Sequence, residues 1–296
     1  MRKELNGKTR TCGLLGNPVE HTLSPLIHNS LAEMKDINMV YVPFLVEIPE
    51  ITTAVKGAYA LNLLGMNATV PFKSDVIPHL IDVDELAADI GAVNTLVRVD
   101  GGYKGYNTDM SGLFRAMQSE NIVLEQEEII ILGAGGAARA VAYMCANYGA
   151  KHITILNRTL PKAQAIATEI NESMKKKSRW EEDCMEAMPL DAYTKLPDRK
   201  YIVIQSTSVG LHPHIDEVVI EDKKFYEKVS IGFDLIYKPA ETKFMKLVKE
   251  AGGKSYNGLK MLLYQGVIAF ELWNDVKVTE EEAMQVYAEL EKAVRV

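Results

Sequence analysis

The stretch that decides the fold is Ile129-Ile130-Ile131-Leu132-Gly133-Ala134-Gly135-Gly136-Ala137-Ala138. Its four leading apolar residues predict a buried β-strand, and the segment Arg139–Asn147 predicts a helix. Between them lies the pattern G-x-G-x-x-A, in which the first glycine allows a tight turn and the second lets the backbone approach a pyrophosphate. Because a helix N-terminus also attracts phosphate, the stretch predicts a dinucleotide-binding loop. The residues expected to bind the cofactor there are Gly133, Ala134, Gly135, Gly136 and Ala137.

The next strand, expected at Ile153–Leu156, indicates which dinucleotide is bound. An NAD site usually carries Asp or Glu at the end of this strand, where the carboxylate accepts from the ribose hydroxyls. Here the chain continues Asn157-Arg158-Thr159, with Lys162 beyond and no carboxylate. An arginine can form two parallel hydrogen bonds to a phosphate, and a lysine adds charge. Asn157, Arg158, Thr159 and Lys162 are therefore predicted to bind the 2′-phosphate side of NADP.

Further apolar runs after this unit complete one doubly wound domain. Strands are expected at Met185–Leu190, Tyr201–Gln205, Ile231–Leu235 and Lys254–Tyr256. With the two strands above they make six, the number in a Rossmann-type nucleotide-binding domain. The chain ends in a predicted helix that begins with a capping box of Thr279 and Glu282.

The first third of the chain predicts a second α/β sheet. Strands are expected at Thr11–Leu15, Tyr41–Val46 and Leu63–Val70, and a hairpin at Val93–Tyr106 around Asp100-Gly101-Gly102. Helices are expected from Ser24-Pro25 onward, with Pro at the first helical position, and over Ser74–Leu80. Strands alternating with helices predict an α/β fold overall.

Length and composition bound the remaining possibilities. The 296 residues are enough for about two domains. Lys and Arg number 33 against 40 Asp and Glu, a net charge of -7, which argues against a nucleic-acid partner. We see no signal peptide, no membrane span, no phosphate-binding P-loop and no metal-ligand spacing, and Cys12, Cys145 and Cys184 are too scattered for a disulfide framework. A cytoplasmic protein that binds a small molecule is expected.

Several further motifs, taken together, resemble the shikimate dehydrogenase family. In chain order they are Gly16-Asn17-Pro18, His21-Thr22-Leu23-Ser24-Pro25, Asn67-Ala68-Thr69-Val70-Pro71-Phe72-Lys73, Gly91-Ala92-Val93-Asn94-Thr95, Tyr106-Asn107-Thr108-Asp109, the glycine loop, Asn157-Arg158-Thr159, and Asn257-Gly258-Leu259-Lys260-Met261-Leu262 with Gln265. The resemblance spans residues 13 to 273, and V-P-F-K, G-A-V-N-T and N-T-D in this order are highly specific.

The resemblance implies two domains with a cleft between them. A substrate-binding catalytic domain would comprise residues 1–109 and 262–296, and a Rossmann-type NADP domain residues 110–261. The implied activity is the NADP-dependent, reversible reduction of 3-dehydroshikimate to shikimate in the biosynthesis of chorismate and the aromatic amino acids. A monomer and a homodimer are both compatible with the sequence.

The resemblance also implies roles for single residues. Lys73 and Asp109 would be the catalytic pair. Gly258 and Met261 would lie by the nicotinamide. The residues implied to bind the substrate are Thr22, Ser24, Asn67, Thr69, Asn94, Tyr237 and Gln265.

Each of these residues also has an ordinary structural interpretation. Ser24 or Asp109 could cap a helix, Asn67 and Asn94 could lie in turns, and Lys73 could be a surface lysine. Three alternative functions also stay open: a quinate/shikimate dehydrogenase that uses NAD or NADP, another two-domain NADP dehydrogenase, and a non-catalytic sensor of shikimate-like ligands or NADP. Thr22 departs from a serine that is usual in the family, Tyr106 from a residue that is often small or polar, and Lys162 from a common arginine.

Overall fold

The computed structural model describes residues 5–295, and the chain folds into two compact units. Unit 1 comprises the residues up to Ala116 and those from Lys260 onward, and unit 2 comprises Met117–Leu259. Among the described residues each unit contains one six-stranded sheet covered by helices. The α/β fold class predicted from the sequence is confirmed. In the same part of the chain, no helix is both long and apolar enough to cross a membrane.

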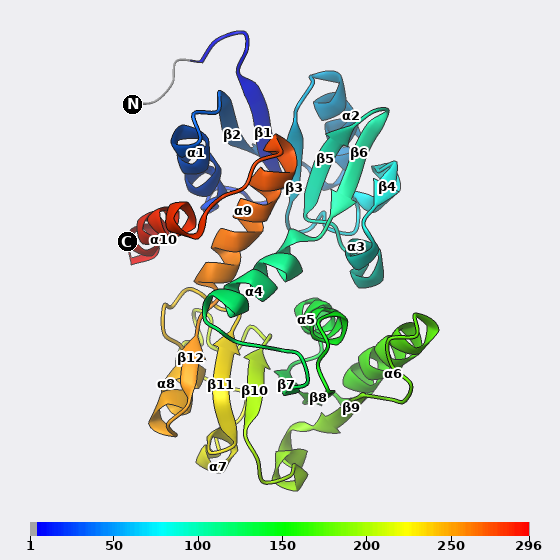
Figure 1. Ribbon diagram of the computed structural model, residues 1–296, viewed down its shortest axis with the longest axis vertical. Helices are drawn as coiled ribbons and strands as arrows, with labels where there is room; N and C mark the ends of the chain where they lie inside the picture. Colours follow the sequence, from blue (N-terminus) through cyan, green and yellow to red (C-terminus); the bar gives the residue numbers. More distant parts are fainter. Residues whose placement is uncertain (1–4, 296) are drawn as a thin grey trace. The chain divides into compact units, whose positions relative to one another are not determined.

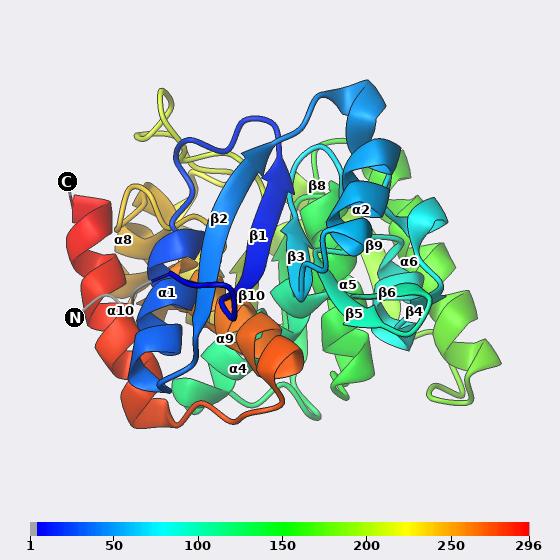
Figure 2. The same ribbon diagram turned by 90° about the horizontal axis from the view of Figure 1, so that it is seen from above.

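The sheet of unit 1 has the strand order β2-β1-β3-β5-β6-β4. Its strands are β1 (Arg10–Gly16), β2 (Met39–Leu45), β3 (Gly65–Ala68), β4 (Asp82–Val83), β5 (Thr95–Val99) and β6 (Gly102–Tyr106). β2, β1 and β3 are parallel neighbours and lie side by side in Figure 2. β5 pairs antiparallel with both β3 and β6, so the expected hairpin is present. The sheet is therefore mixed.

The helices of unit 1 cover both faces of this sheet. They are α1 (Ser24–Met34), α2 (Ile51–Ala60), α3 (Glu85–Ile90), α4 (Thr108–Ser119), α9 (Leu259–Asn274) and α10 (Glu280–Arg295), with 3₁₀ turns at Ile48–Glu50 and Ile77–His79. Met66 and Ala68 of β3 face a core shared with α2 and α3. Gly65 faces Trp273 of α9, whose indole nitrogen donates to the Leu96 carbonyl at 2.9 Å. Because side chains alternate along a strand, Asn67 shares the α9 face with Gly65.

The predicted helix over Ser74–Leu80 is wrong. The segment forms turns and the short 3₁₀ helix at Ile77–His79. Pro78 has no N–H to donate, so an α-helix could not continue its hydrogen bonds through this position. The capping box at the last helix is confirmed, since Thr279 N donates to the Glu282 carboxylate at 2.8 Å and Glu282 N donates to Thr279 Oγ1 at 3.3 Å.

The sheet of unit 2 has the strand order β12-β11-β10-β7-β8-β9, and every pair in it is parallel. Its strands are β7 (Glu128–Leu132), β8 (His152–Asn157), β9 (Met185–Pro189), β10 (Tyr201–Gln205), β11 (Val229–Asp234) and β12 (Lys254–Tyr256), of which β10, β11 and β12 lie side by side in Figure 1. In this doubly wound order the direction of winding reverses between β7 and β10, where ligands usually bind.

The helices of unit 2 pack on a core of branched residues. They are α5 (Gly136–Asn147), α6 (Leu160–Lys176), α7 (Lys223–Tyr226) and α8 (Lys243–Glu250), with a 3₁₀ turn at Leu190–Lys195. Ile130 and Leu132 face a core that includes Phe225 and Val248. The next residues along β7 alternate to the opposite face, so both faces of the sheet are buried.

Candidate functional site

The first candidate site is a cavity of about 510 Å³ in unit 2. It lies at the carboxyl ends of β7, β8 and β10. The residues that line it are Gly133, Ala134, Gly135, Gly136, Ala137, Asn157, Arg158, Thr159, Lys162, Ser206, Thr207 and Ser208. The structure thus brings together all nine residues that the sequence predicted from the glycine loop and the end of the second strand.

The glycine loop has the backbone that a phosphate cradle requires. Gly133 has φ of +110°, a conformation that side chains strongly disfavour. Gly135 and Gly136 face open space, because a Cβ on either would meet no protein atom within 4 Å. α5 begins at Gly136, so the positive end of its backbone dipole is at this cavity. The loop therefore fits a pyrophosphate.

The far end of the cavity is cationic. Arg158, Thr159 and Lys162 are exposed, while Asn157 Nδ2 donates to the Thr159 carbonyl at 2.9 Å and so holds the turn after β8. The lining contains the guanidinium and the ammonium but no carboxylate. An anionic group on the ligand fits this end.

Ser206, Thr207 and Ser208 were not predicted from the sequence. They follow β10 directly, next to β7 in the sheet. Ser206 Oγ donates to the Leu132 carbonyl at 2.7 Å, and the Thr207 methyl lies 2.7 Å from where a Cβ on Gly133 would be. The rule that ligands bind at the carboxyl ends of strands where the winding reverses could have found them.

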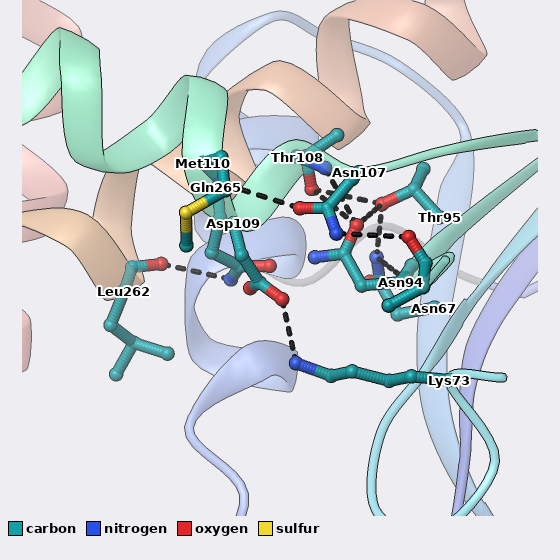
Figure 3. Close-up of polar contacts among 11 residues, drawn as sticks. Asn67, Lys73, Asn94, Thr95, Asn107, Thr108, Asp109, Met110, Leu262 and Gln265 are labelled. Carbon is teal, nitrogen blue, oxygen red and sulfur yellow. Dashed lines mark hydrogen bonds and ion pairs between the residues drawn. The ribbon is translucent and has the colours of Figure 1, made fainter. Parts of the chain in front are cut away.

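A second candidate site lies in unit 1, around an ion pair (Figure 3). Lys73 Nζ lies 2.6 Å from Asp109 Oδ2. The Lys73 side chain is 36% exposed and that of Asp109 18%, so ligand can reach both groups. Within residues 5–295, Asp109 Oδ1 has no hydrogen-bond donor. The pair therefore leaves ammonium hydrogens and one carboxylate oxygen available to a ligand.

Local structure explains why these two side chains meet. Lys73 comes directly after Phe72, which is fully buried in the turn after β3. The Lys73 carbonyl accepts a hydrogen bond from Val93 N at 2.7 Å. Asp109 lies in the first turn of α4, where the helix dipole favours an anion. Lys73 is thus neither in a helix nor a lone surface lysine.

Asn94 holds the start of α4. Its Oδ1 accepts from Thr108 N at 2.7 Å, from Thr108 Oγ1 at 3.1 Å and from Thr95 Oγ1 at 3.0 Å. With the acceptor occupied in this way, the Nδ2 group is the part left for a ligand. Asn107 Oδ1 caps the same helix through Met110 N at 3.2 Å. Asp109 is therefore not needed as a cap, and the asparagine side chains place it beside Lys73.

Asn67 belongs to the same network (Figure 3). Its Nδ2 donates to the Asn94 carbonyl at 3.1 Å and to Thr95 Oγ1 at 3.0 Å, so both amide hydrogens are used. Its Oδ1 accepts from the Tyr41 hydroxyl at 2.7 Å. Asn67 is 4% exposed within β3 and is not a turn residue. Only an acceptor lone pair on Oδ1 is left for a ligand.

The network extends through Tyr41 to the start of α1. Burial raises the pKa of Tyr41, and a hydrogen bond with the Ser24 side chain partly offsets this rise. Thr22 Oγ1 donates to Ser24 Oγ at 3.2 Å. α1 begins at Ser24 and its N-cap is Leu23, so the interpretation of Ser24 as an N-cap is wrong. His28 stacks on the Tyr41 ring with centroids 4.2 Å apart.

The other residues predicted in unit 1 are Gln265, Thr69 and Met261. Gln265 of α9 donates from Nε2 to the Leu262 carbonyl at 2.9 Å, and a Cβ on Gly112, one turn after Asp109, would lie 2.5 Å from Gln265 N. The Thr69 methyl lies beside Gly16, and Thr69 N donates to the Leu15 carbonyl at 3.0 Å. Met261 is half-buried on α9.

Tyr237 and Gly258 belong to unit 2. Tyr237 lies in the loop after β11, and burial raises the pKa of its phenol. Gly258 is buried after β12, and its N–H donates to the Ile236 carbonyl at 3.0 Å. Among residues 5–295 no cluster of three or more His, Cys, Asp or Glu side chains could hold a metal ion.

Comparison with known proteins finds family models that match three stretches of the sequence. Three family models match in order, described as shikimate dehydrogenase substrate binding domain (residues 14–96), shikimate / quinate 5-dehydrogenase (residues 116–219) and shikimate 5'-dehydrogenase C-terminal domain (residues 258–286). A relative from Desulforamulus reducens named shikimate dehydrogenase (NADP(+)) is 42% identical over 273 residues, 91% of each chain.

Two solved structures are similar over nearly the whole chain. A shikimate dehydrogenase in complex with NADP+ has a TM-score of 0.86 and 39% identity, covering 98% of both chains. A shikimate 5-dehydrogenase from Listeria monocytogenes in complex with shikimate and NAD also has a TM-score of 0.86, with 30% identity, covering 97% of this chain and 99% of the other.

Proposed function

The chain belongs to the shikimate dehydrogenase family, and we propose that it catalyses the reversible, NADP-dependent reduction of 3-dehydroshikimate to shikimate. The reaction would serve the biosynthesis of chorismate and the aromatic amino acids. The observation that carries the proposal is the Lys73–Asp109 pair, with 2.6 Å between Nζ and Oδ2, at the edge of a network of buried amides and hydroxyls.

The pair suits the reduction of a ketone to an alcohol. Bound NADPH supplies the hydride that the carbonyl carbon receives. The Lys73 ammonium donates a hydrogen bond to the carbonyl oxygen, stabilises the negative charge that develops there, and gives up a proton to form the hydroxyl. The Asp109 carboxylate accepts a hydrogen bond from the ammonium and so orients it. In the oxidative direction the single hydroxyl proton returns to this hydrogen-bonded pair.

The amide network suits a substrate covered with hydroxyls. Asn67 is left with an acceptor and Asn94 with a donor, so each meets one side of a hydroxyl group. A site that hydrogen-bonds each hydroxyl discriminates strongly against analogues that lack one. We propose that Thr22, Ser24, Asn67, Thr69, Asn94, Tyr237 and Gln265 bind the substrate.

The cavity of unit 2 suits NADP. The glycine loop offers backbone N–H groups and a helix N-terminus to the pyrophosphate, and Arg158 and Lys162 offer cations to the 2′-phosphate. The absence of a carboxylate from the lining disfavours the free ribose hydroxyls of NAD. Gly258 and Met261 are proposed to lie by the nicotinamide.

Each unit then has its own role. Unit 1 would bind the substrate and carry the catalytic pair, and unit 2 would bind NADP. The proposed substrate is a small molecule. A monomeric or homodimeric state, a cytoplasmic location and the lack of a nucleic-acid partner stay predictions from the sequence.

Absorbance at 340 nm tests the proposal. The protein is mixed with shikimate or quinate and with NADP or NAD, alongside a Lys73→Met variant. We expect rapid reduction of NADP with shikimate and little with quinate or NAD. Comparable rates with quinate or NAD would favour a quinate/shikimate dehydrogenase instead. Folded protein that is inactive in every pairing would contradict the enzyme and favour a sensor.

A further inference from the structure

Two polar side chains are buried side by side at the carboxyl ends of adjacent strands in unit 2. Gln205 is the last residue of β10 and Asp234 the last of β11, and the two are register partners. Gln205 is 1% exposed and Asp234 is fully buried. Gln205 Nε2 donates to Asp234 Oδ1 at 3.3 Å. Neither residue lines the nucleotide cavity.

Gln205 holds the backbone of the loop that forms one wall of that cavity. Its Oε1 accepts from Thr207 N at 2.5 Å, and its Nε2 donates to the carbonyls of Val209 at 3.1 Å and Thr207 at 3.4 Å. Thr207 in turn packs its methyl against Gly133 of the phosphate cradle. Two hydrogen bonds from Ser206 to the Leu132 carbonyl fix the start of this wall, and the buried Gln205 amide fixes the Thr207–Val209 part beyond it.

Asp234 holds the neighbouring loop. Its Oδ1 accepts from Ile236 N at 3.0 Å, and its Oδ2 accepts from Thr242 Oγ1 at 2.6 Å. Ile236 precedes Tyr237 and accepts through its carbonyl from Gly258 N at 3.0 Å. Among the described residues Asp234 has no cationic partner, so only these neutral donors compensate the burial of its charge.

We propose that Gln205 and Asp234 are positioning residues that fix the 206–210 loop and the 235–242 loop together, so that dinucleotide binding depends on a pair that never touches the ligand. The inference rests on the proposed function, in which the cavity takes NADP. Gln205 fixes the 206–210 loop through hydrogen bonds to its backbone. Asp234 fixes the loop that contains Tyr237 and also accepts a hydrogen bond from Gln205.

Binding of NADPH, measured by its fluorescence, tests the role of Gln205. Gln205→Met keeps the length of the side chain but loses every hydrogen bond to the loop, and we expect NADPH to bind about tenfold more weakly. Gln205→Asn is a milder second variant, too short to reach Val209, and should shift binding in the same direction. Because the loop of Tyr237 is held by Asp234, the KM for shikimate should change much less than the Kd for NADPH.

Asn171 offers a matched control. It is another buried amide of unit 2, and it bonds both the N–H and the carbonyl of Met185 at 3.1 and 2.9 Å, away from the cavity lining. Asn171→Leu should lower the melting temperature as much as Gln205→Met does, yet leave NADPH binding unchanged. Wild-type NADPH affinity in both Gln205 variants would overturn the inference.

Asp234 is tested by a conservative and a disruptive variant. In Asp234→Asn the amide oxygen can still accept from Ile236 N and Gln205, and the amide can donate to Thr242 Oγ1, so both NADPH and shikimate should bind as in the wild type. Asp234→Leu removes these bonds and should weaken both ligands. Loss of binding in the Asn variant, or normal binding in the Leu variant, would overturn this role. Failure of the wild type itself to bind NADPH would instead refute the proposed function.

Discussion

Asp234→Asn should remove a pH-dependent penalty from the stability of unit 2. Burial raises the pKa of Asp234 to about 6 from an ordinary value of 3.8, although hydrogen bonds from Thr242, Ile236 and Gln205 lower it in part. The folded protein therefore binds this proton more tightly than the unfolded chain does. By linkage, the contribution of Asp234 to the free energy of unfolding is highest below about pH 4, where its carboxyl is neutral in both states. It falls as the pH rises through 6, because the buried carboxyl then has to ionise.

The size of the penalty follows from the pKa difference. A difference of about two pH units corresponds to about 3 kcal/mol at neutral pH, at about 1.4 kcal/mol for each unit. Between pH 4.5 and 7.5 about 2 kcal/mol of it should develop. An asparagine cannot ionise and carries no such term. The free energy of unfolding of the variant, minus that of the wild type, should therefore rise by about 2 kcal/mol over this range.

Urea unfolding followed by circular dichroism measures this difference at each pH. The surface carboxyls whose pKa values are lowered, such as Asp222 and Glu241, are common to both proteins and cancel in the comparison. Of the groups around Asp234, Tyr226 titrates only at far higher pH, because burial and nearby carboxylates raise its pKa. A difference that stays constant from pH 4.5 to 7.5 would show that Asp234 ionises normally in the fold, which would refute the reasoning from burial.

Three further predictions test the site. Lys73→Met should lower kcat at least about 100-fold and leave the melting temperature unchanged. As a control, Lys104→Met, which breaks the Lys104–Asp82 ion pair, should leave kcat unchanged. Normal turnover in Lys73→Met would contradict the catalytic assignment. Arg158→Ala combined with Lys162→Ala should raise the KM for NADP by about 10- to 100-fold and leave that for NAD unchanged, so equal losses with both would exclude a 2′-phosphate contact. Thr95→Val should lower the free energy of unfolding by about 1–3 kcal/mol. It should also lower kcat/KM for shikimate without changing the Kd for NADPH, and an unaltered kcat/KM would show that the Thr95 hydroxyl does not position Asn67 and Asn94.

Much of the fold follows from local sequence signals. The glycine loop between a strand and a helix, the hairpin around Gly101 and the Thr279 capping box all rest on neighbouring residues, and the structure contains each of them. The expected helix at Ser74–Leu80 failed for an equally local reason, since Pro78 interrupts it. Where the determining interaction is short-range, the sequence was sufficient.

In the candidate cofactor cavity, the residues that belong to local motifs were predicted and those placed by strand pairing were not. Every cofactor residue predicted from the loop and from the turn after β8 lines one cavity, because both segments follow parallel strands that are paired in the sheet. Ser206 and Thr207 complete that cavity but carry no motif of their own. Their place depends on the pairing of β10 with β7, which brings together residues more than 70 positions apart in the chain.

The residues that support Asn67 and Asn94 were the hardest to predict, for a physical reason. Asn67 and Asn94 looked like ligand-binding or turn residues, yet most of their hydrogen-bonding capacity is spent on Tyr41, Thr95 and Thr108. These hydrogen bonds leave one acceptor on Asn67 and one donor on Asn94 in fixed directions, which a flexible surface amide could not offer. Preorganisation of this kind requires buried partners from several strands, and a partner is buried only once the whole sheet has formed. The sequence motifs identified Asn67 and Asn94, but they gave no role to the buried partners Tyr41, Thr95 and Thr108 that orient them.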